Sequence, residues 1–154
     1  MEDIYEKLKA ITKEENILKD EPMSKHTTFR TGGNADYYVM PESSEEVQKI
    51  LKVFKDENIV VLGNGSNVLV TDKGIRGIVV SLRKLNKCEI IDDTMIVECG
   101  FPIAKASQIA AQNGLSGLEF ACGIPGTVRW CSFYECWSIW WRNERCCNFF
   151  NIHR

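Results

Sequence analysis

The stretch that decides the fold combines a short apolar run with a glycine-rich loop. It reads Ile59-Val60-Val61-Leu62-Gly63-Asn64-Gly65-Ser66-Asn67-Val68-Leu69-Val70. Its first four residues are apolar and mostly β-branched, which predicts a buried strand. The two glycines that follow permit positive φ, so that successive backbone N–H groups of the loop can surround a phosphate. A tight turn between two strands is the alternative that an Asn-Gly pair by itself favours.

Length, composition and charge limit the class of protein. The chain has 154 residues, of which 44% are hydrophobic and 26% charged, as in ordinary globular proteins with one domain or two small lobes. A net charge of -2 gives no basic footprint, so nucleic acid is not expected as a partner. No apolar run reaches the length of a membrane span, and the acidic N-terminus differs from a secretory signal. We therefore expect a cytoplasmic protein whose seven cysteines stay reduced.

The residues before the loop predict a strand–helix–strand unit. A helix is expected over 3–15, a polar connection over 16–25 and a strand over 35–40. Ser43 and Glu46 form a capping box that begins a second helix. The apolar face of this helix has the spacing i, i+3, i+4, i+7 and consists of Val47, Ile50, Leu51 and Phe54. The glycine loop then lies at the carboxyl end of the next strand, where open α/β sheets bind ligands.

The residues after the loop are rich in predicted strands. Strands are expected over 68–71 and 77–82, a hairpin over 88–99, and a helix over 103–113 that ends at a glycine. A Rossmann dinucleotide fold is not expected, because strand rather than helix follows the loop. In addition, Val68 stands where that motif has its third glycine.

Isolated cysteines and one histidine occur in this part of the chain. Cys88, Cys99 and Cys122 lack the spacing of metal ligands, and we expect them in the core as small apolar residues. His26 can serve as a ligand or base, but beside two threonines a structural hydrogen-bonding role is favoured. No metal site is predicted.

A second glycine-rich stretch covers residues 114–128. It contains four glycines and one proline between apolar residues, whereas an unconstrained loop is more polar. Close approach of the backbone to a large planar cofactor accounts for the missing side chains. A buried, turn-rich crossing between two lobes accounts for them equally well.

Three blocks of the sequence together resemble one enzyme family. The blocks are His26-Thr27-Thr28-Phe29-Arg30-Thr31-Gly32-Gly33, Leu62-Gly63-Asn64-Gly65-Ser66-Asn67 and Gly117-Leu118-Glu119-Phe120-Ala121-Cys122-Gly123-Ile124-Pro125-Gly126-Thr127-Val128. In this order and spacing they are similar to the UDP-N-acetylenolpyruvoylglucosamine reductase family, also called UDP-N-acetylmuramate dehydrogenase or MurB. The similarity covers roughly residues 15–128.

The resemblance implies a fold and a cofactor site. The fold is the α+β FAD-binding fold of the vanillyl-alcohol oxidase (PCMH) type, with a first lobe, an incomplete second lobe and FAD between them. The Gly63-Asn64-Gly65-Ser66-Asn67 loop would cradle the pyrophosphate of FAD. The segment Gly123-Ile124-Pro125-Gly126-Thr127 would lie along the cofactor. The expected domains are 1–25 (helix and connection), 26–128 (FAD-binding) and 129–154 (aberrant tail).

The resemblance also implies an activity, which is reduction of UDP-N-acetylglucosamine enolpyruvate to UDP-N-acetylmuramate for peptidoglycan synthesis. NADPH would reduce the flavin, and the substrate would be a nucleotide sugar bound by a monomeric enzyme. The family's catalytic residues lie beyond Val128, so none is assigned here and the chain alone is expected to be inactive. The alternative is a small α+β module that binds a nucleotide or phosphate without flavin.

The last 26 residues differ in composition from the rest of the chain. All four tryptophans lie there, namely Trp130, Trp137, Trp140 and Trp141. The resemblance implies that Gly-Gly-Ala and then a Met-Asn-Ala-Gly-Ala-Tyr-Gly-Gly type segment should follow Val128. Tryptophan has the single codon TGG, so that reading one base further on converts each tryptophan into a glycine, at the spacing of the glycines in this missing motif. We therefore expect residues 129–154 to be out of frame after a one-base insertion near the Val128 codon. The rival interpretation is a zinc site formed by Cys131, Cys136, Cys146, Cys147 and His153, which lack a Cys-x-x-Cys pair.

Overall fold

The computed structural model describes residues 2–128, and residues 1 and 129–154 lie outside the described part. The chain divides at the Lys84–Leu85 bond into two compact units, which are described one at a time. The expected out-of-frame tail and the rival zinc ligands both fall in 129–154, outside the described residues.

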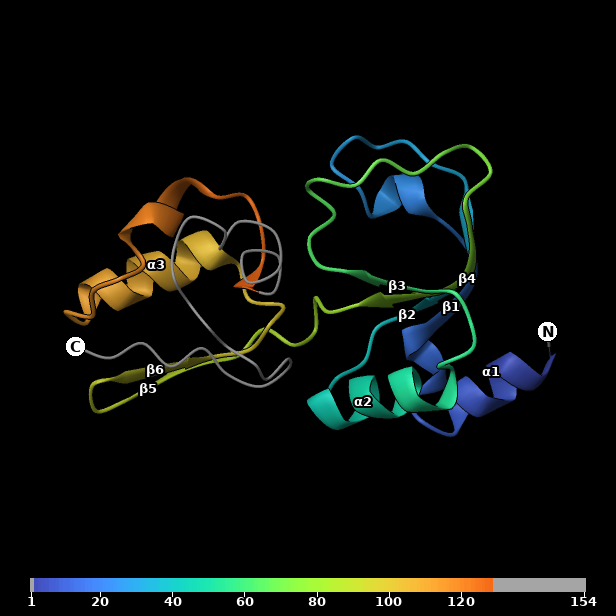
Figure 1. The fold of residues 1–154 in the computed structure, drawn as a ribbon, viewed down its shortest axis with the longest axis horizontal. Helices are drawn as coiled ribbons and strands as arrows, with labels where there is room; N and C mark the ends of the chain where they lie inside the picture. The colour runs from blue at the N-terminus through green and yellow to red at the C-terminus, as the bar shows by residue number, and fades with distance from the viewer. Residues whose placement is uncertain (1, 129–154) are drawn as a thin grey trace. The chain divides into compact units, whose positions relative to one another are not determined.

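The first unit is built on a four-stranded sheet (Figure 1). In spatial order its strands are β1 (Ile17–Pro22), β2 (Asn34–Val39), β4 (Ile75–Ser81) and β3 (Ile59–Leu62). β1 is antiparallel to β2, whereas β2 and β3 are both parallel to β4. The predicted strand–helix–strand unit is therefore split by a strand that comes later in the chain. β4 consequently has a strand on each side, and its residues Ile78, Val79 and Val80 are fully buried.

Helices cover one face of this sheet and long loops cover the other. Figure 1 shows α1 (Glu2–Lys9) and α2 (Ser44–Val53) on one side, and the loops that contain residues 26–33 and 63–74 on the other. The capping of α2 is confirmed, because Ser43 Oγ accepts a hydrogen bond from the Glu46 N–H at 3.2 Å. The Glu46 carboxylate in turn accepts one from the Glu42 N–H at 2.9 Å.

Three predictions for the first unit differ from the structure, although the N-terminal helix itself is present as α1. The helix over 3–15 ends at Lys9, and the segment taken as a polar connection contains β1. The sequence does not reveal β1, because the middle residues of this strand are polar and exposed. β1 is an edge strand that is held by backbone pairing to β2. Residues 68–71 form no strand. Their link to the segment before β2 is a hydrogen bond of 2.9 Å from the Gly33 N–H to the Thr71 carbonyl.

The strand before the glycine loop is present but is less buried than predicted. β3 lies at the edge of the sheet, so only Leu62 is buried, and the three residues before it are half-buried. Only one neighbour in the sheet covers an edge strand, and a run of apolar residues does not reveal this position.

The second unit packs a hairpin and a helix around its own core (Figure 1). β5 (Cys88–Ile91) pairs antiparallel with β6 (Thr94–Val97), followed by α3 (Ile103–Gln112) and the 3₁₀ helix η3 (Glu119–Gly123). The hairpin and the helix are as predicted, and Gly114 ends the helix with a φ of 71°. The core consists of Met95, Val97, Phe101, Ile103, Ala106, Ala110, Leu115, Leu118, Ala121 and Val128.

The cysteines lie less deep than expected. Cys88 and Cys99 are half-buried, and burial raises the pKa of the Cys88 thiol. Cys122 is exposed, so its expected core position is wrong. In the tight turn of η3 the preceding residue, Ala121, faces the core, and the side chain of Cys122 therefore faces outward.

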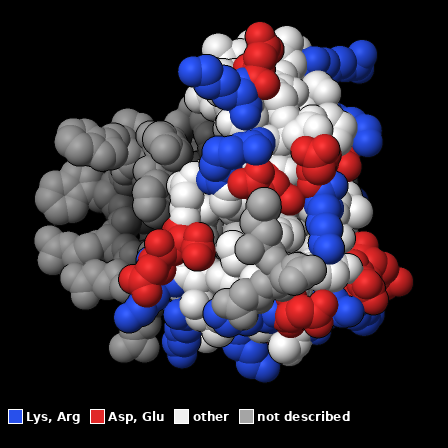
Figure 2. All heavy atoms as spheres, turned by 90° about the vertical axis from the view of Figure 1, so that its right-hand side faces the viewer, with Lys and Arg blue, Asp and Glu red and all other residues white. Residues whose placement is uncertain are grey.

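Charged side chains of both signs are mixed on the surface, and the α-helices are short. On the face shown in Figure 2, Lys and Arg side chains alternate with Asp and Glu, as expected for a chain with a net charge of -2. Within residues 2–128, every α-helix is too short to cross a membrane.

Candidate functional site

The glycine loop Gly63–Asn67 leaves the sheet at the carboxyl end of β3, as predicted. At this end β3 and β4 stay paired beyond their last residues. Leu62 lies opposite Ser81, and Leu82 N–H donates to the Leu62 carbonyl at 2.9 Å. The residues that follow both strands therefore emerge next to each other.

The first of the three family blocks, which begins at His26, contacts the loop and supports it. Thr28 N–H donates to the Gly65 carbonyl at 3.0 Å, which places residues 26–28 against the loop. Gly65 has a φ of 70°, and a Cβ at this position would overlap the His26 carbonyl oxygen. Glycine is required here both for conformation and for space. Of the two loop glycines expected to have positive φ, only Gly65 has it, and Gly63 does not.

The backbone N–H groups of the loop have no hydrogen-bond partner in the described part of the chain. Within residues 2–128, no N–H from Gly63 to Asn67 donates a hydrogen bond. The side chains are partly occupied with each other, since the Asn64 amide donates to Ser66 Oγ at 3.3 Å. Successive unpaired N–H groups in a short loop form a concavity suited to an anion, and a phosphate group has the oxygens to accept from several of them.

His26 has the structural role that was expected of it. Its Nε2 lies 2.9 Å from Glu21 Oε1, and its ring stacks on Tyr38 with 3.9 Å between centroids and 21° between planes. Burial raises the pKa of Tyr38, and the nearby Ser81 hydroxyl and Arg83 guanidinium partly oppose that rise. Through Glu21, Tyr38 and Ser81 this cluster joins β1, β2 and β4 next to the segment 26–28 that supports the loop.

The second predicted segment, Gly123–Thr127, belongs to the second unit. It is tied to the start of α3, because Ile103 N–H donates to the Gly126 carbonyl at 3.0 Å and Val128 N–H to the Phe101 carbonyl at 2.9 Å. Gly123 and Pro125 are exposed, Ile124 is half-buried, and Gly126 and Thr127 are buried. The segment is therefore anchored at its end and presents its first residues at the surface.

Two features of this segment fit a ligand. The φ of Gly123 is not positive and a Cβ there would touch nothing within 4 Å, so the described packing does not explain why this residue is glycine. The Thr127 Oγ1 is buried, and among the described residues it has no hydrogen-bond partner. A buried hydroxyl without a partner is costly, and a ligand that bonds to it removes the cost.

Each segment by itself fits one part of a cofactor that carries phosphates and a large planar group, such as FAD. The loop supplies donors for phosphate, and Gly123 leaves space for a flat surface to approach. Within residues 2–128 no three His, Cys, Asp or Glu side chains are grouped so as to hold a metal ion.

Comparison with known proteins decides the family. The model of the FAD binding domain family matches residues 35–129, more than half of the chain. The chain belongs to the FAD binding domain family. Among curated proteins it is similar to UDP-N-acetylenolpyruvoylglucosamine reductase of Staphylococcus aureus (strain Newman), with 46% identity over 128 residues. That match covers 82% of this chain and 42% of the relative, so the chain spans less than half of the curated proteins it resembles.

Solved structures support the family and the fold. The crystal structure of the MurB reductase from Thermus caldophilus is 34% identical with a TM-score of 0.57, and the match covers 73% of this chain and 38% of that one. p-Cresol methylhydroxylase, at 18% identity and a TM-score of 0.53, shares the fold over 73% of this chain and 25% of its own. The resemblance to MurB and the α+β fold of the FAD binding domain family are thus confirmed.

Sequence analysis missed two contributors to the loop, Thr28 and Arg83. Arg83 Nη2 donates to the Asn64 carbonyl at 3.1 Å, although 19 residues separate the two. Thr28 lies in the first of the three family blocks, but that block does not reveal its contact with the loop, and nothing in the local sequence marks Arg83. Both residues reach the loop through the order of strands in the sheet.

Proposed function

We propose that this chain is the FAD-binding portion of an NADPH-dependent reductase that converts UDP-N-acetylglucosamine enolpyruvate to UDP-N-acetylmuramate. The observation that carries the FAD part is the row of N–H groups from Gly63 to Asn67 at the end of β3, which have no partner among residues 2–128. The reaction and its substrate are inferred from the similarity to the reductases, whose length this chain covers only in part. For the whole enzyme we infer a cytoplasmic monomer that uses a nucleotide sugar for peptidoglycan synthesis, and we expect this chain by itself to be inactive.

When bound, FAD supplies the hydride-transfer chemistry of such an enzyme. The residues of this chain bind and orient it. The N–H groups of Gly63, Asn64, Gly65, Ser66 and Asn67 would hold the pyrophosphate, and Gly123, Ile124, Pro125, Gly126 and Thr127 would lie along the cofactor. The Thr127 hydroxyl, which is buried without a described partner, would gain a hydrogen bond.

FAD titration of the purified 154-residue chain tests the proposal. We expect the visible flavin bands to shift on binding and the protein to retain flavin through gel filtration. A chain that retains no FAD under any condition would refute the proposal. That result would leave the alternative, a module that binds a phosphate or nucleotide without flavin. For such a module we expect binding of ADP and no additional affinity for FAD.

Gly123→Ala provides a matched variant. The φ of Gly123 is not positive and the space around it is open, so alanine should leave the melting temperature unchanged. If the flavin lies against this residue, the added methyl group should weaken FAD binding while ADP binding stays the same. Equal affinities of the variant and the parent chain for FAD would remove Gly123 from the site.

A further inference from the structure

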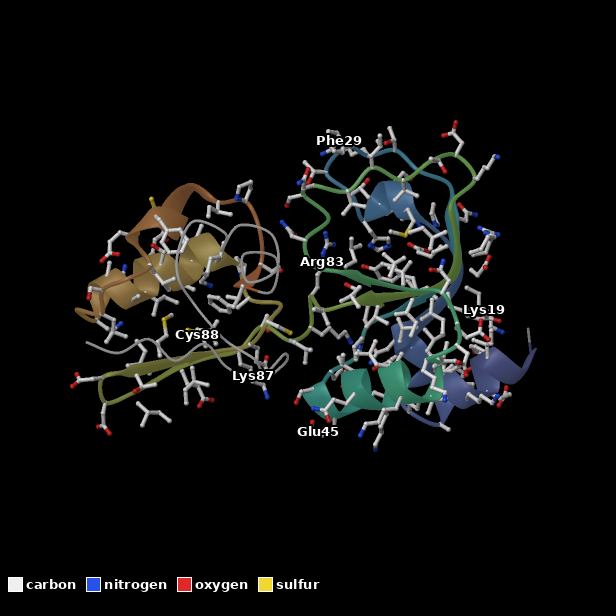
Figure 3. All side chains as sticks on the ribbon, viewed as in Figure 1. Lys19, Phe29, Glu45, Arg83, Lys87 and Cys88 are labelled. Carbon is white, nitrogen blue, oxygen red and sulfur yellow. The ribbon has the colours of Figure 1, made fainter. Side chains whose placement is uncertain are left out.

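Arg83 lies directly beside the glycine loop. It follows β4 by two residues, at the point where the pairing of Leu82 with Leu62 ends the sheet. Figure 3 labels its side chain at the end of the sheet from which the loop emerges. Its Nη2 donates to the Asn64 carbonyl at 3.1 Å, so the guanidinium touches the loop itself.

No carboxylate of residues 2–128 balances the charge of Arg83. Among the described residues it forms no ion pair, and its side chain is exposed. The adjacent cation is engaged elsewhere, since Lys84 Nζ lies 2.6 Å from Asn16 Oδ1 and 2.9 Å from Glu42 Oε1. A guanidinium has five N–H donors in a planar fork, and the bond to Asn64 uses one of them.

The contact with Asn64 also changes the character of the loop. A carbonyl oxygen close to an anion site repels the anion, whereas one that accepts a bond from a cation presents less negative charge. The guanidinium therefore offsets the partial negative charge on the Asn64 carbonyl oxygen, and it still has N–H donors left for a phosphate oxygen.

We propose that Arg83 is the cation of the pyrophosphate site formed by Gly63–Asn67, binding the phosphate directly while it holds the loop through Asn64. The assignment rests on the proposed FAD function. It gives the site a charge-assisted contact in addition to the neutral N–H groups of the loop. This cation comes from the neighbouring strand rather than from the glycine motif.

Arg83→Met, Arg83→Lys and a control, Lys52→Met, test this assignment in the full chain. Lys52 is exposed on α2, which covers the opposite face of the sheet, so its loss removes one positive charge away from the loop (Figure 1). A hydrogen bond to a charged group contributes enough that Arg83→Met should weaken FAD binding by about ten- to a hundredfold. Arg83→Lys keeps the charge but not the planar fork, so its affinity for FAD should lie between those of Arg83→Met and the parent chain. Lys52→Met should bind FAD like the parent chain.

The salt dependence of FAD binding separates direct phosphate contact from support of the loop. The dissociation constant of the parent chain should rise with ionic strength, and this rise should be smaller in Arg83→Met and unchanged in Lys52→Met. Melting temperatures of all variants show that they fold. Unaltered FAD affinity in Arg83→Met, or a loss of affinity with an unaltered salt dependence, would overturn the assignment and leave the FAD function standing. A parent chain that binds no FAD would overturn both.

Discussion

Replacing Gly65 with alanine should break the loop and with it the cofactor site. The φ of Gly65 is 70°, a region that costs a residue with a side chain roughly 1–2 kcal/mol. The new Cβ would overlap the His26 carbonyl oxygen, and backbone cannot rotate away as a side chain can. Overpacking of this kind costs about 1–3 kcal/mol. The two effects together predict a loss of about 2–5 kcal/mol from the stability of the first unit.

Thermal unfolding of Gly65→Ala measures this loss. In a domain of fewer than 100 residues each kcal/mol lowers the melting temperature by about 4–8 °C, so a fall of about 8 °C or more is expected. The loop can relieve the overlap only by moving away from residues 26–28, which lengthens the bond from Thr28 N–H to the Gly65 carbonyl. FAD affinity should therefore fall by more than tenfold, because misplaced donors lose the phosphate.

Ser66→Ala is the matched control for this variant. Ser66 lies in the same loop and its side chain accepts only the weak 3.3 Å bond from Asn64 among the described residues. Its replacement should change stability by about 0.5 kcal/mol or less. The reasoning about Gly65 is refuted if Gly65→Ala melts and binds FAD as Ser66→Ala does.

Three further predictions concern acid stability, the second helix and the C-terminal residues. Hydrogen bonds from Lys13, Lys84 and Asn16 lower the pKa of Glu42 from 4.5 to about 2, so its contribution to stability is complete above pH 4.5 and is lost as the pH falls towards 2. Acid titrations followed by circular dichroism should show a smaller loss over this range in Glu42→Gln, and identical acid profiles would contradict the role of this carboxylate. Ser43→Ala removes the cap of α2 and should cost about 1 kcal/mol in chemical denaturation, whereas an unchanged midpoint would show that the cap is dispensable. Sequencing the coding DNA after the Val128 codon should reveal the family's glycine motif in the adjacent reading frame, and its absence there would exclude the frameshift.

Local features of the sequence predicted much of what the structure contains. The capping box of α2, the hairpin of β5 and β6, and the glycine that ends α3 all involve residues a few positions apart. Such interactions depend on neighbours in the chain, so the sequence displays them directly. The glycine-rich blocks also identified the family, because they occur in the order and spacing of its members.

What the sequence by itself determined, then, is most of the helices and strands, the FAD-binding family and the two glycine-rich segments that we propose for the site. The tertiary structure alone decided that β4 lies between β2 and β3, and that the polar segment before η2 (Met23–Lys25) pairs as β1. It also decided that residues 26–28 support Gly65 and that Arg83 reaches Asn64. These contacts join residues far apart in the chain, and their geometry depends on the order of strands. Backbone pairing sets that order, and it leaves no pattern in the residues that it brings together.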